Sequence, residues 1–486
     1  MAKILMFQGT GSSVGKSVLV AGIARALTNK GYNVLPFKPQ NMSNNAAVTV
    51  DGGEIGRAQA LQAFACRVDP VVHMNPVLLK PHNVQGSQIV VQGKIWGQAS
   101  AREYQEIKPQ LLDYVTESFN LLKRKADIIL IEGAGSASEI NLRKNDIANM
   151  GFAQAVKAPV ILIGDIDRGG VIASLIGTHK ILPSNDLKLV KGFIVNKMRG
   201  DPSLFTETME WISHKTGWKN CGLLPFFDEL RKLPAEDAAD LKADKSSYQY
   251  GKLHISVLLL PNIANFDDFD PLKNEPHILL EFISPGSVVP AFTKVIIIPG
   301  SKNTISDLNA LYQTGWDIDI KAHVRRGGYV FGICGGYQML GQQILDPLGI
   351  EKSSNDRIKG LGFFKSDTIL SSEKKLEAVT GHLALKDIDC EGYEMHVGQT
   401  KHHGTYKPFA YLDDSRAEGA ISDNGQVIGT YLHGIFHCDE VRDYLLSYFG
   451  SSGDGILYEQ QLDSVMNNWA NFINDNILVD NLISLL

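Results

Sequence analysis

One cysteine of the chain stands where a nucleophile could be exposed. The stretch VFGICGGYQMLG, residues 330–341, predicts a strand that ends in a tight turn at Cys334 and continues as a helix. A strand–turn–helix elbow of this kind lifts a side chain clear of the backbone. The alternative is a buried thiol without reactivity, which most single cysteines are. The glycines around Cys334 favour the exposed nucleophile.

Groups that would assist a cysteine nucleophile occur elsewhere in the chain. The backbone N–H of Gly335 can stabilise an oxyanion, and PGSKN offers a second donor at Gly300 or Ser301. A base is available at His433, in VIGTYLHGIFH. Taken alone, this histidine could equally be a loop residue whose hydrogen bonds are satisfied. Together the segments predict a nucleophilic site built on Cys334 and His433.

A second glycine-rich stretch, QGTGSSVGKS, follows the first apolar run and opens the first helical pattern. Backbone N–H groups of small residues can close around an anion, and the helix N-terminus adds a favourable dipole. Lys16 can reach the β- and γ-phosphates of ATP, and Ser17 can ligate Mg²⁺. The spacing departs from the strict P-loop, because Thr10 stands where the first glycine would fall. A tight turn with a solvent-exposed lysine is the alternative. The predicted ATP-binding residues are Gly9, Thr10, Gly11, Ser12, Ser13, Val14, Gly15, Lys16 and Ser17.

Acidic residues follow two later apolar runs. IEGAG places Glu132 at the end of a predicted strand, where it could hold the metal with Ser17. GDIDRGG places Asp165, Asp167 and Arg168 at the end of another strand. Because parallel strands bring their carboxyl ends to one edge of a sheet, we expect these groups to lie near the phosphate loop. For each acid alone, loop solvation or helix capping is the alternative.

The elements that must position these groups follow an α/β pattern. Continuous Ile/Val/Leu runs such as ADIILIEGAG and APVILIGDID predict parallel strands buried on both faces, with helical patterns between them. A polar stretch at residues 236–252 predicts a linker, after which a new α/β set begins. We therefore expect two tandem doubly wound domains. Their predicted limits are residues 1–240 and 252–447, followed by a helical C-terminal tail at residues 448–486.

Composition narrows the class of protein. The chain has 486 residues, of which 44% are hydrophobic and 21% charged, and a formal net charge of −6. These values are typical of a soluble globular protein and predict no general attraction to nucleic acid. The apolar run near the N-terminus is too short for a signal peptide, and no apolar run elsewhere reaches membrane-spanning length. We therefore expect no membrane partner and a cytoplasmic location. Five scattered cysteines without a CxxC pair argue against a zinc site or a disulfide framework.

The motifs together resemble known families. GICGGYQMLG with a later GTYLHG resembles the class I glutamine amidotransferases, and QGTGSSVGKS resembles the deviant phosphate loop of the dethiobiotin synthetase-like ATPases. In this order, the two are similar to the glutamine-hydrolysing cobalamin-pathway amidotransferases. Longer blocks, among them PFKPQNMSNN, EGAGSASEINLRKNDIANMG, DIDRGGVIASL, LPNIANFDDFDPL and GYEMHVG, favour the branch that amidates adenosylcobyrinic acid a,c-diamide.

This resemblance implies a fold and a reaction. The N-terminal domain would be P-loop-like and the C-terminal domain class I glutamine amidotransferase-like. Members use ATP and glutamine to amidate the b, d, e and g carboxylates of a cobalt corrinoid, through an acyl phosphate and ammonia. By resemblance, the loop around Lys16 binds ATP, with Ser17 and Glu132 near Mg²⁺. Cys334 would form a γ-glutamyl thioester, and His433 would shuttle protons in its formation and hydrolysis.

The resemblance also suggests residues that contact the substrates. Glu394 and His396 of GYEMHVG would line the glutaminase pocket, although an ordinary strand edge would show the same alternation. Ile435 stands where most class I members have a glutamate, two residues after His433. Cobalamin-type members share this absence, so it supports the branch and leaves open what orients His433. The predicted corrinoid-binding residues are Asn41, Asn141, Arg143, Asp146, Asp165 and Arg168.

Two other functions are compatible with parts of the sequence. A cobyrinic acid a,c-diamide synthase performs the same chemistry on other side chains. A ParA/MinD-like ATPase switch shares the deviant phosphate loop, but such proteins dimerise on nucleotide and bind DNA or membranes. The elbow at Cys334 and the lack of a basic patch favour the amidotransferase. Small molecules are the expected partners, and whether the chain forms a homodimer stays open.

Overall fold

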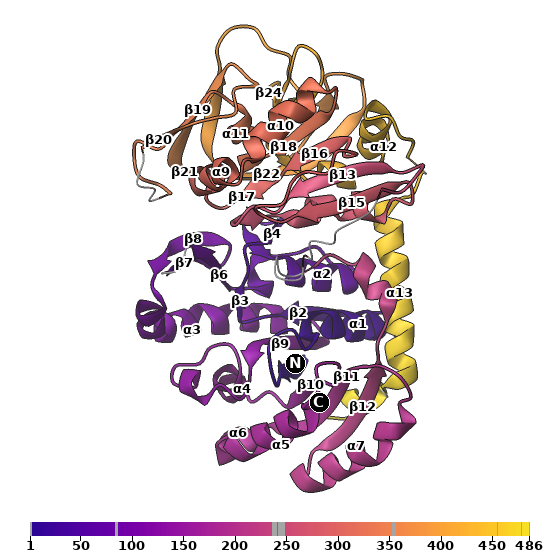
Figure 1. The fold of residues 1–486 in the computed structure, drawn as a ribbon. Helices are drawn as coiled ribbons and strands as arrows, with labels where there is room; N and C mark the ends of the chain where they lie inside the picture. Colours follow the sequence, from indigo (N-terminus) through magenta and orange to yellow (C-terminus); the bar gives the residue numbers. More distant parts are fainter. Residues whose placement is uncertain are drawn as a thin grey trace. The chain divides into compact units, whose positions relative to one another are not determined.

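The computed structural model describes residues 2–82, 86–235, 241, 248–351, 356–453, 455–477 and 479–485. The chain divides into two compact units, one formed by Met1–Glu236 with Leu462–Leu486 and the other by Asp237–Gln461 (Figure 1). Most of the predicted linker falls at residues 236–240 and 242–247, outside the described residues. The domain limits drawn from the sequence stay predictions.

The first unit is built on a six-stranded sheet in the order β12-β11-β10-β1-β9-β2, with every pair parallel. Successive residues of β1 enter opposite apolar clusters, Met6 on one face and Leu5 and Phe7 on the other. A sheet buried on both faces produces the continuous apolar runs seen in the sequence, so the doubly wound prediction is confirmed. The strands are β1 (Lys3–Gly9), β2 (Val34–Phe37), β9 (Ile128–Ser136), β10 (Val160–Asp165), β11 (Val190–Met198) and β12 (Lys219–Pro225).

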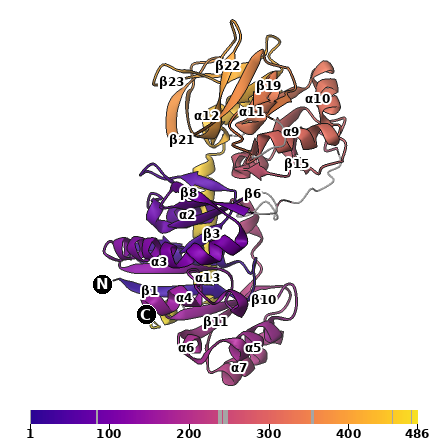
Figure 2. The ribbon, with the colours of Figure 1, turned by 90° about the vertical axis from the view of Figure 1, so that its left-hand side faces the viewer.

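Helices cover both faces of this sheet. Residues of α1, α13 and α14 share one apolar cluster, whereas residues of α3, α4, α5 and α7 belong to the other, and Figures 1 and 2 show α3 and α13 on opposite sides of the sheet. The helices are α1 (Lys16–Asn29), α2 (Arg57–Ala65), α3 (Ala101–Lys123), α4 (Met150–Val156), α5 (Val171–Ile181), α6 (Ser184–Leu187), α7 (Ser203–Thr216), α13 (Tyr458–Asn476) and α14 (Val479–Ile483).

Helix α13 completes the core of the first unit. Trp469 is 1% exposed, and its indole N–H donates to the Val18 carbonyl at 2.8 Å. The ring lies against Gly22 so closely that a Cβ atom there would overlap it, which explains a glycine inside α1. The fully buried guanidinium of Arg25 pairs with Asp463. The C-terminal residues that match no motif in the sequence are therefore a structural part of this unit.

Two small sheets extend the first unit on the side of the β2–α3 connection. One has the order β3-β6-β7-β8 and the other is the pair β4-β5. A buried ion pair between Lys80 and Glu54 joins β6 to β5. The strands are β3 (Gln40–Met42), β4 (Ala46–Val48), β5 (Glu54–Gly56), β6 (Val77–His82), β7 (Gly86–Val91) and β8 (Lys94–Ala99).

The second unit contains another six-stranded sheet, in the order β15-β13-β16-β18-β26-β25. Its pairs are parallel except for the antiparallel pair β25–β26, which agrees with a second α/β fold. The strands are β13 (Leu253–Leu258), β15 (Ile278–Ile283), β16 (Val295–Ile298), β18 (Tyr329–Ile333), β25 (Ala420–Ile421) and β26 (Val427–Thr430). The helices are α8 (Asp270–Asn274), α9 (Thr304–Gln313), α10 (Trp316–Arg325), α11 (Gly335–Leu340) and α12 (Asp439–Tyr448).

A second, largely antiparallel sheet of this unit was not anticipated from the sequence. Its long pair, β21 (Ser366–Leu383) and β22 (Asp389–His402), has mixed polar and apolar residues, which do not resemble the buried runs of the parallel sheets. The short strand β27 (Leu432–His433) pairs with β22 and so fixes the backbone of His433 opposite Tyr393. The remaining strands are β14 (Ile263–Ala264), β17 (Gly300–Ser301), β19 (Gln343–Leu345), β20 (Arg357–Lys359), β23 (Ala410–Leu412) and β24 (Ala417–Glu418).

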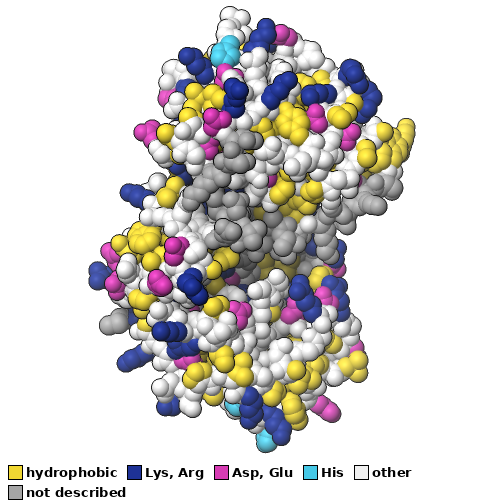
Figure 3. All heavy atoms as spheres, turned by 60° about the vertical axis from the view of Figure 1, so that its left-hand side comes forward, with side chains coloured by type: hydrophobic (Ala, Val, Ile, Leu, Met, Phe, Trp, Pro, Cys, Tyr) yellow, Lys and Arg dark blue, Asp and Glu magenta, His cyan; other side chains and the backbone are white. Residues whose placement is uncertain are grey.

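The visible surface is mixed in charge. On the face shown in Figure 3, basic and acidic side chains are interspersed with apolar ones. Among the helices of the described residues, none combines the length and the apolar character needed to cross a bilayer.

Candidate active sites

Cys334 lies on a strained elbow between β18 and α11. Its backbone has φ 52° and ψ −109°, a conformation that residues with a side chain rarely adopt. The two following glycines are required by the neighbouring strand. A Cβ atom on Gly336 would overlap the Ile298 carbonyl, and one on Gly335 would lie 3.0 Å from the Ser301 backbone nitrogen. The glycines that flank Cys334 in the sequence thus let the elbow pack against the end of β16.

His433 is oriented by a carboxylate that the sequence analysis did not identify. Its Nδ1 lies 2.7 Å from Oδ2 of Asp268, and the Gly434 N–H donates to Oδ1 of the same carboxylate at 2.7 Å. Asp268 and His433 are both buried. Asp268 belongs to a 3₁₀ turn, Phe266–Phe269, far from His433 in sequence. With Nδ1 donating to Asp268, Nε2 is left to exchange a proton with Cys334.

The charge state of His433 follows from these neighbours. Burial alone lowers its pKa, but the Asp268 carboxylate and the Cys334 side chain, both of which also form hydrogen bonds with the ring, raise it to about 10. The Tyr393 ring stacks on the imidazole with centroids 5.2 Å apart. The site therefore favours the imidazolium form of His433, a cation placed beside the cysteine.

Two backbone donors lie side by side next to Cys334. A Cβ atom on Gly335 would lie 3.0 Å from the Ser301 backbone nitrogen, so the two residues that could supply oxyanion donors are neighbours in the fold. The Ser301 hydroxyl donates to Asp307 at 2.6 Å, so its backbone rather than its side chain is the available donor. Gly300 faces a different group, because a Cβ atom there would lie 3.1 Å from Cε1 of His433. The second oxyanion donor, at Gly300 or Ser301, stays a prediction.

Strand β22 carries Glu394 and His396 past the cysteine. The Cys334 thiol lies 3.6 Å from the Met395 carbonyl oxygen, to which it donates. Glu394 is buried and accepts two hydrogen bonds from Arg416, at 3.0 and 2.7 Å. Burial alone raises the pKa of Glu394, but bonds from His396, Arg416 and Lys375 hold it well below its usual range. Glu394 is thus a permanent anion beside the elbow, and its predicted role in the glutaminase pocket stays a prediction.

The phosphate loop of the first unit connects β1 to α1. Lys16 lies across the loop, and its ammonium donates to the carbonyls of Gly11 at 3.1 Å and Gly135 at 3.0 Å. A Cβ atom on Gly9 would lie 2.6 Å from the Gly11 carbonyl oxygen, so glycine is required at that position. The Thr10 N–H donates to Ile163 of β10 at 2.9 Å, which ties the loop to the sheet edge. The remaining loop residues, Ser12 to Gly15, turn the chain into α1, with Ser13 and Gly15 at positive φ.

Ser17 and Glu132 are brought together as predicted from the sequence. The Ser17 hydroxyl donates to Oε1 of Glu132 at 2.7 Å. Hydroxyl and carboxylate oxygens suit Mg²⁺, which usually takes few protein ligands and completes its shell with phosphate oxygens and water. The described residues contain no group of three or more His, Cys, Asp or Glu side chains that could hold a metal by themselves. The residues present therefore fit a Mg²⁺ ion that arrives with a nucleotide.

Lys38 is a further charged group of this site that the sequence analysis missed. Its ammonium lies 2.9 Å from Oε1 of Glu132, and Gln62 donates to Oε2 at 2.6 Å. Both side chains are buried. Lys38 follows β2, and β2 is the neighbour of β9, which carries Glu132. In the sequence, Lys38 is only a lysine directly after a predicted strand. Its link to Glu132 can be inferred only once β2 is known to pair with β9.

The predicted corrinoid-binding residues separate into two groups. Asp165 and Arg168 lie at the end of β10, and the Asp165 carboxylate pairs with Lys197 at 2.9 Å. The others mostly make contacts that hold the structure together. Arg143 forms a bidentate pair with Asp186 at 2.7 and 2.9 Å. The Asp146 carboxylate accepts N–H groups at the start of α4, the buried amide of Asn41 donates to Gln59 at 3.0 Å, and Asn141 is exposed.

Comparisons with known proteins match the N-terminal and C-terminal parts of the chain to two different family models. Residues 5–240 match the family model of the CobQ/CobB/MinD/ParA nucleotide binding domain, and residues 254–441 match that of the CobB/CobQ-like glutamine amidotransferase domain. The cobyric acid synthase of Granulibacter bethesdensis is 54% identical, over 99% of this chain and 100% of that protein. Those of a Bradyrhizobium species and Methylorubrum populi are 53% and 51% identical, over 100% of this chain and 97% and 99% of those proteins. The chain therefore belongs to the cobyric acid synthase family of glutamine-dependent amidotransferases.

Proposed function

We propose that this chain amidates the b, d, e and g carboxylates of adenosylcobyrinic acid a,c-diamide, using ATP and glutamine. The observation that carries the proposal is the His433–Asp268 pair beside Cys334, in a chain that also holds a phosphate loop. A carboxylate does not react with ammonia, because an oxide leaves poorly. One half of the chain would activate the acid and the other half would supply nitrogen.

In the glutaminase half, the Cys334 thiolate attacks the side-chain amide carbon of glutamine. The backbone N–H groups of Gly335 and Ser301 hold the oxyanion of the tetrahedral intermediate. His433 then gives its Nε2 proton to the leaving nitrogen, so that ammonia departs and a γ-glutamyl thioester remains. Neutral His433 next takes a proton from water, which attacks the thioester and releases glutamate and the thiolate. Asp268 stabilises the imidazolium that exists before the first transfer and forms again after the second.

In the synthetase half, a corrinoid carboxylate oxygen attacks the γ-phosphorus of ATP, giving an acyl phosphate and ADP. Lys16 and the loop amides neutralise charge on the transferred phosphoryl group. Ser17 and Glu132 would hold Mg²⁺, whose charge offsets that of the phosphate oxygens. Ammonia then attacks the acyl carbon, phosphate leaves, and one proton is lost to give the amide. Lys38, beside Glu132, adds a second positive charge where the phosphoryl group passes.

The test follows the carboxylate oxygen. With ¹⁸O in the corrinoid carboxylates, each amidation should transfer one label into inorganic phosphate, and mass spectrometry should show up to four new amides on the a,c-diamide. Unlabelled phosphate would rule out the acyl phosphate. If the a,c-diamide is untouched while cobyrinic acid gains two amides, the chain is instead an a,c-diamide synthase.

A further inference from the structure

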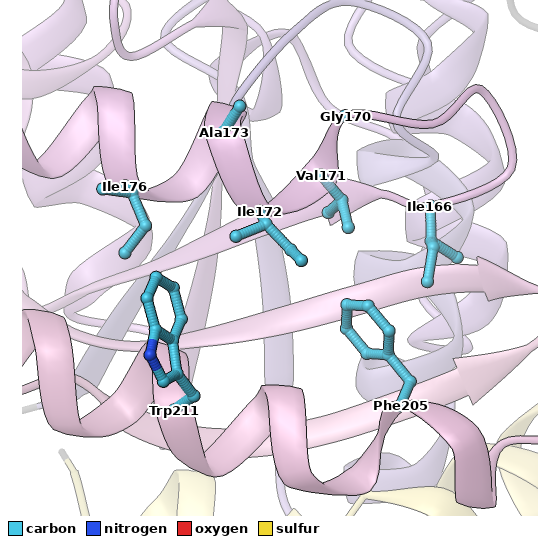
Figure 4. Close-up of a pocket in the computed structure, with 8 residues that line it drawn as sticks. All are labelled: Ile166, Gly170, Val171, Ile172, Ala173, Ile176, Phe205 and Trp211. Carbon is cyan, nitrogen blue, oxygen red and sulfur yellow. The ribbon is translucent and has the colours of Figure 1, made fainter.

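An apolar groove in the first unit takes no part in the chemistry described above. It has a volume of about 500 Å³ and lies between α5 and α7 (Figure 4). Ile172 and Trp211 in its walls are 37% and 46% exposed. Large apolar side chains gathered in a groove at the surface are typical of a binding site. The side chains that define the groove are Ile166, Val171, Ile172, Ile176, Phe205 and Trp211.

The groove begins next to the phosphate loop. Ile166 directly follows Asp165, whose carboxylate pairs with Lys197 at 2.9 Å. The same ammonium donates to the Ser13 carbonyl of the loop at 2.6 Å. One hydrogen-bonded cation therefore links the residue before Ile166 to the phosphate loop. A ligand lying in the groove would have one edge close to the site of phosphoryl transfer.

Positive charges stand at both ends of the apolar surface. At the Ile166 end, Arg168 is exposed and makes no ion pair with any residue in the described part of the chain. At the other end, the Lys215 ammonium lies 5.7 Å from the centre of the Trp211 ring. The nearby Asp167 is already paired with Arg199 at 2.5 Å. An apolar floor with cations at its ends complements a flat, apolar ligand that carries carboxylates around its edge.

We propose that this groove seats one face of the corrin macrocycle. This assignment rests on the proposed function, because it takes a corrinoid acid as the substrate. The peripheral carboxylates that are not reacting would face Arg168 and Lys215, and the reacting one would reach the phosphate loop. Apolar contacts have little directional preference. The ring could therefore be seated in several rotations, which explains how a single phosphoryl site serves four different carboxylates.

The test measures corrinoid binding to the full chain in the absence of ATP. Equilibrium dialysis with adenosylcobyrinic acid a,c-diamide, read by its visible absorbance, should show a Kd raised about ten-fold in Trp211→Ala, because one face of an indole leaves the contact. Ile172→Ser should raise the Kd in the same direction. The matched control is Leu204→Ser on α7, since Leu204 is 81% exposed and does not line the groove. Its Kd should equal that of the wild type, and glutaminase activity should be unchanged in all three variants.

The outcomes separate this proposal from the proposed function. Wild-type amidation of the corrinoid, combined with unchanged Kd values in Trp211→Ala and Ile172→Ser, would overturn the groove assignment alone. A wild-type chain that neither binds nor amidates the corrinoid would overturn both. Sedimentation velocity tests the other occupant of such a surface, a second copy of the chain. If Trp211→Ala converts a dimer into a monomer and leaves corrinoid binding intact, the groove is a subunit interface and the proposal is wrong.

Discussion

The substitution Asp268→Asn tests how the glutaminase half works. Asp268 accepts from the His433 ring and from the Gly434 N–H, both at 2.7 Å. An asparagine of the same shape has one oxygen and one NH₂ group, so it cannot accept both bonds. If its oxygen keeps the Gly434 bond, its NH₂ faces Nδ1 and forces the proton onto Nε2. The imidazole would then have the wrong tautomer to accept a proton from water, and no carboxylate would stabilise the imidazolium.

The size of the effect follows from the pKa of His433. The rise from 6.5 to about 10 corresponds to a net of about 5 kcal/mol in favour of the imidazolium, after the opposing effect of burial, and both Asp268 and Cys334 contribute to it. Loss of the Asp268 carboxylate should lower the glutaminase kcat by about 10² to 10⁴-fold. Because a raised pKa keeps the histidine charged up to about pH 10, wild-type activity should fall only near that pH. In Asp268→Asn the alkaline fall should move toward neutral pH.

The assay is ammonia release from saturating glutamine, followed between pH 6 and pH 10.5. Amidation driven by added ammonium should persist in the variant, which shows that the protein is folded and that the synthetase half works. If glutaminase activity in Asp268→Asn stays within a few-fold of the wild type and its alkaline limb does not move, the orienting role of Asp268 is refuted.

Three further results are expected. Cys334→Ser should reduce glutamine-dependent amidation about 10³-fold or more and leave amidation with added ammonium unchanged. Product analysis with each nitrogen source tests this, and loss of both activities or of neither would contradict it. Lys16→Ala should abolish amidation with both nitrogen sources and leave weak ammonia release from glutamine; amide formation by this variant would contradict the role given to the loop. Trp469→Ala should reduce the free energy of unfolding of the first unit by about 3–5 kcal/mol, measured by urea titration, since its 1%-exposed indole fills the core beside Gly22. A loss below 1 kcal/mol would show that α13 contributes little to that core.

The strands of the parallel sheets could be predicted because each one shows its burial in its own run of residues. A strand buried on both faces must be apolar along its whole length, and runs such as Ile128–Leu130 and Val160–Ile163 show this directly. The elbow at Cys334 and the loop before Lys16 were visible for a related reason. Close approach of backbone to backbone or to an anion requires glycines at fixed offsets, and such offsets can be read from one segment.

Contacts between distant segments could not be predicted in the same way. Asp268 reaches His433 across 165 residues, and Lys38 reaches Glu132 across 94. Each is a common residue in a polar context, and only the strand order and the pairing of β27 with β22 bring the partners together. Ile435, the position that left the orienting group of His433 open, is fully buried. Most class I amidotransferases are expected to carry the orienting acid at this position. Here the carboxylate that contacts His433 is that of Asp268, 165 residues earlier in the chain.

The packing of α13 against α1 has a consequence for how the protein folds during its synthesis. The ribosome delivers the first 236 residues, then the whole glutaminase, and only then the segment that contains Asp463 and Trp469. Until that segment is synthesised, Arg25 lacks its partner Asp463, and the surface of α1 at Gly22 lacks the Trp469 ring that packs on it. The apolar core around α1 is therefore completed only after the whole second unit has been synthesised.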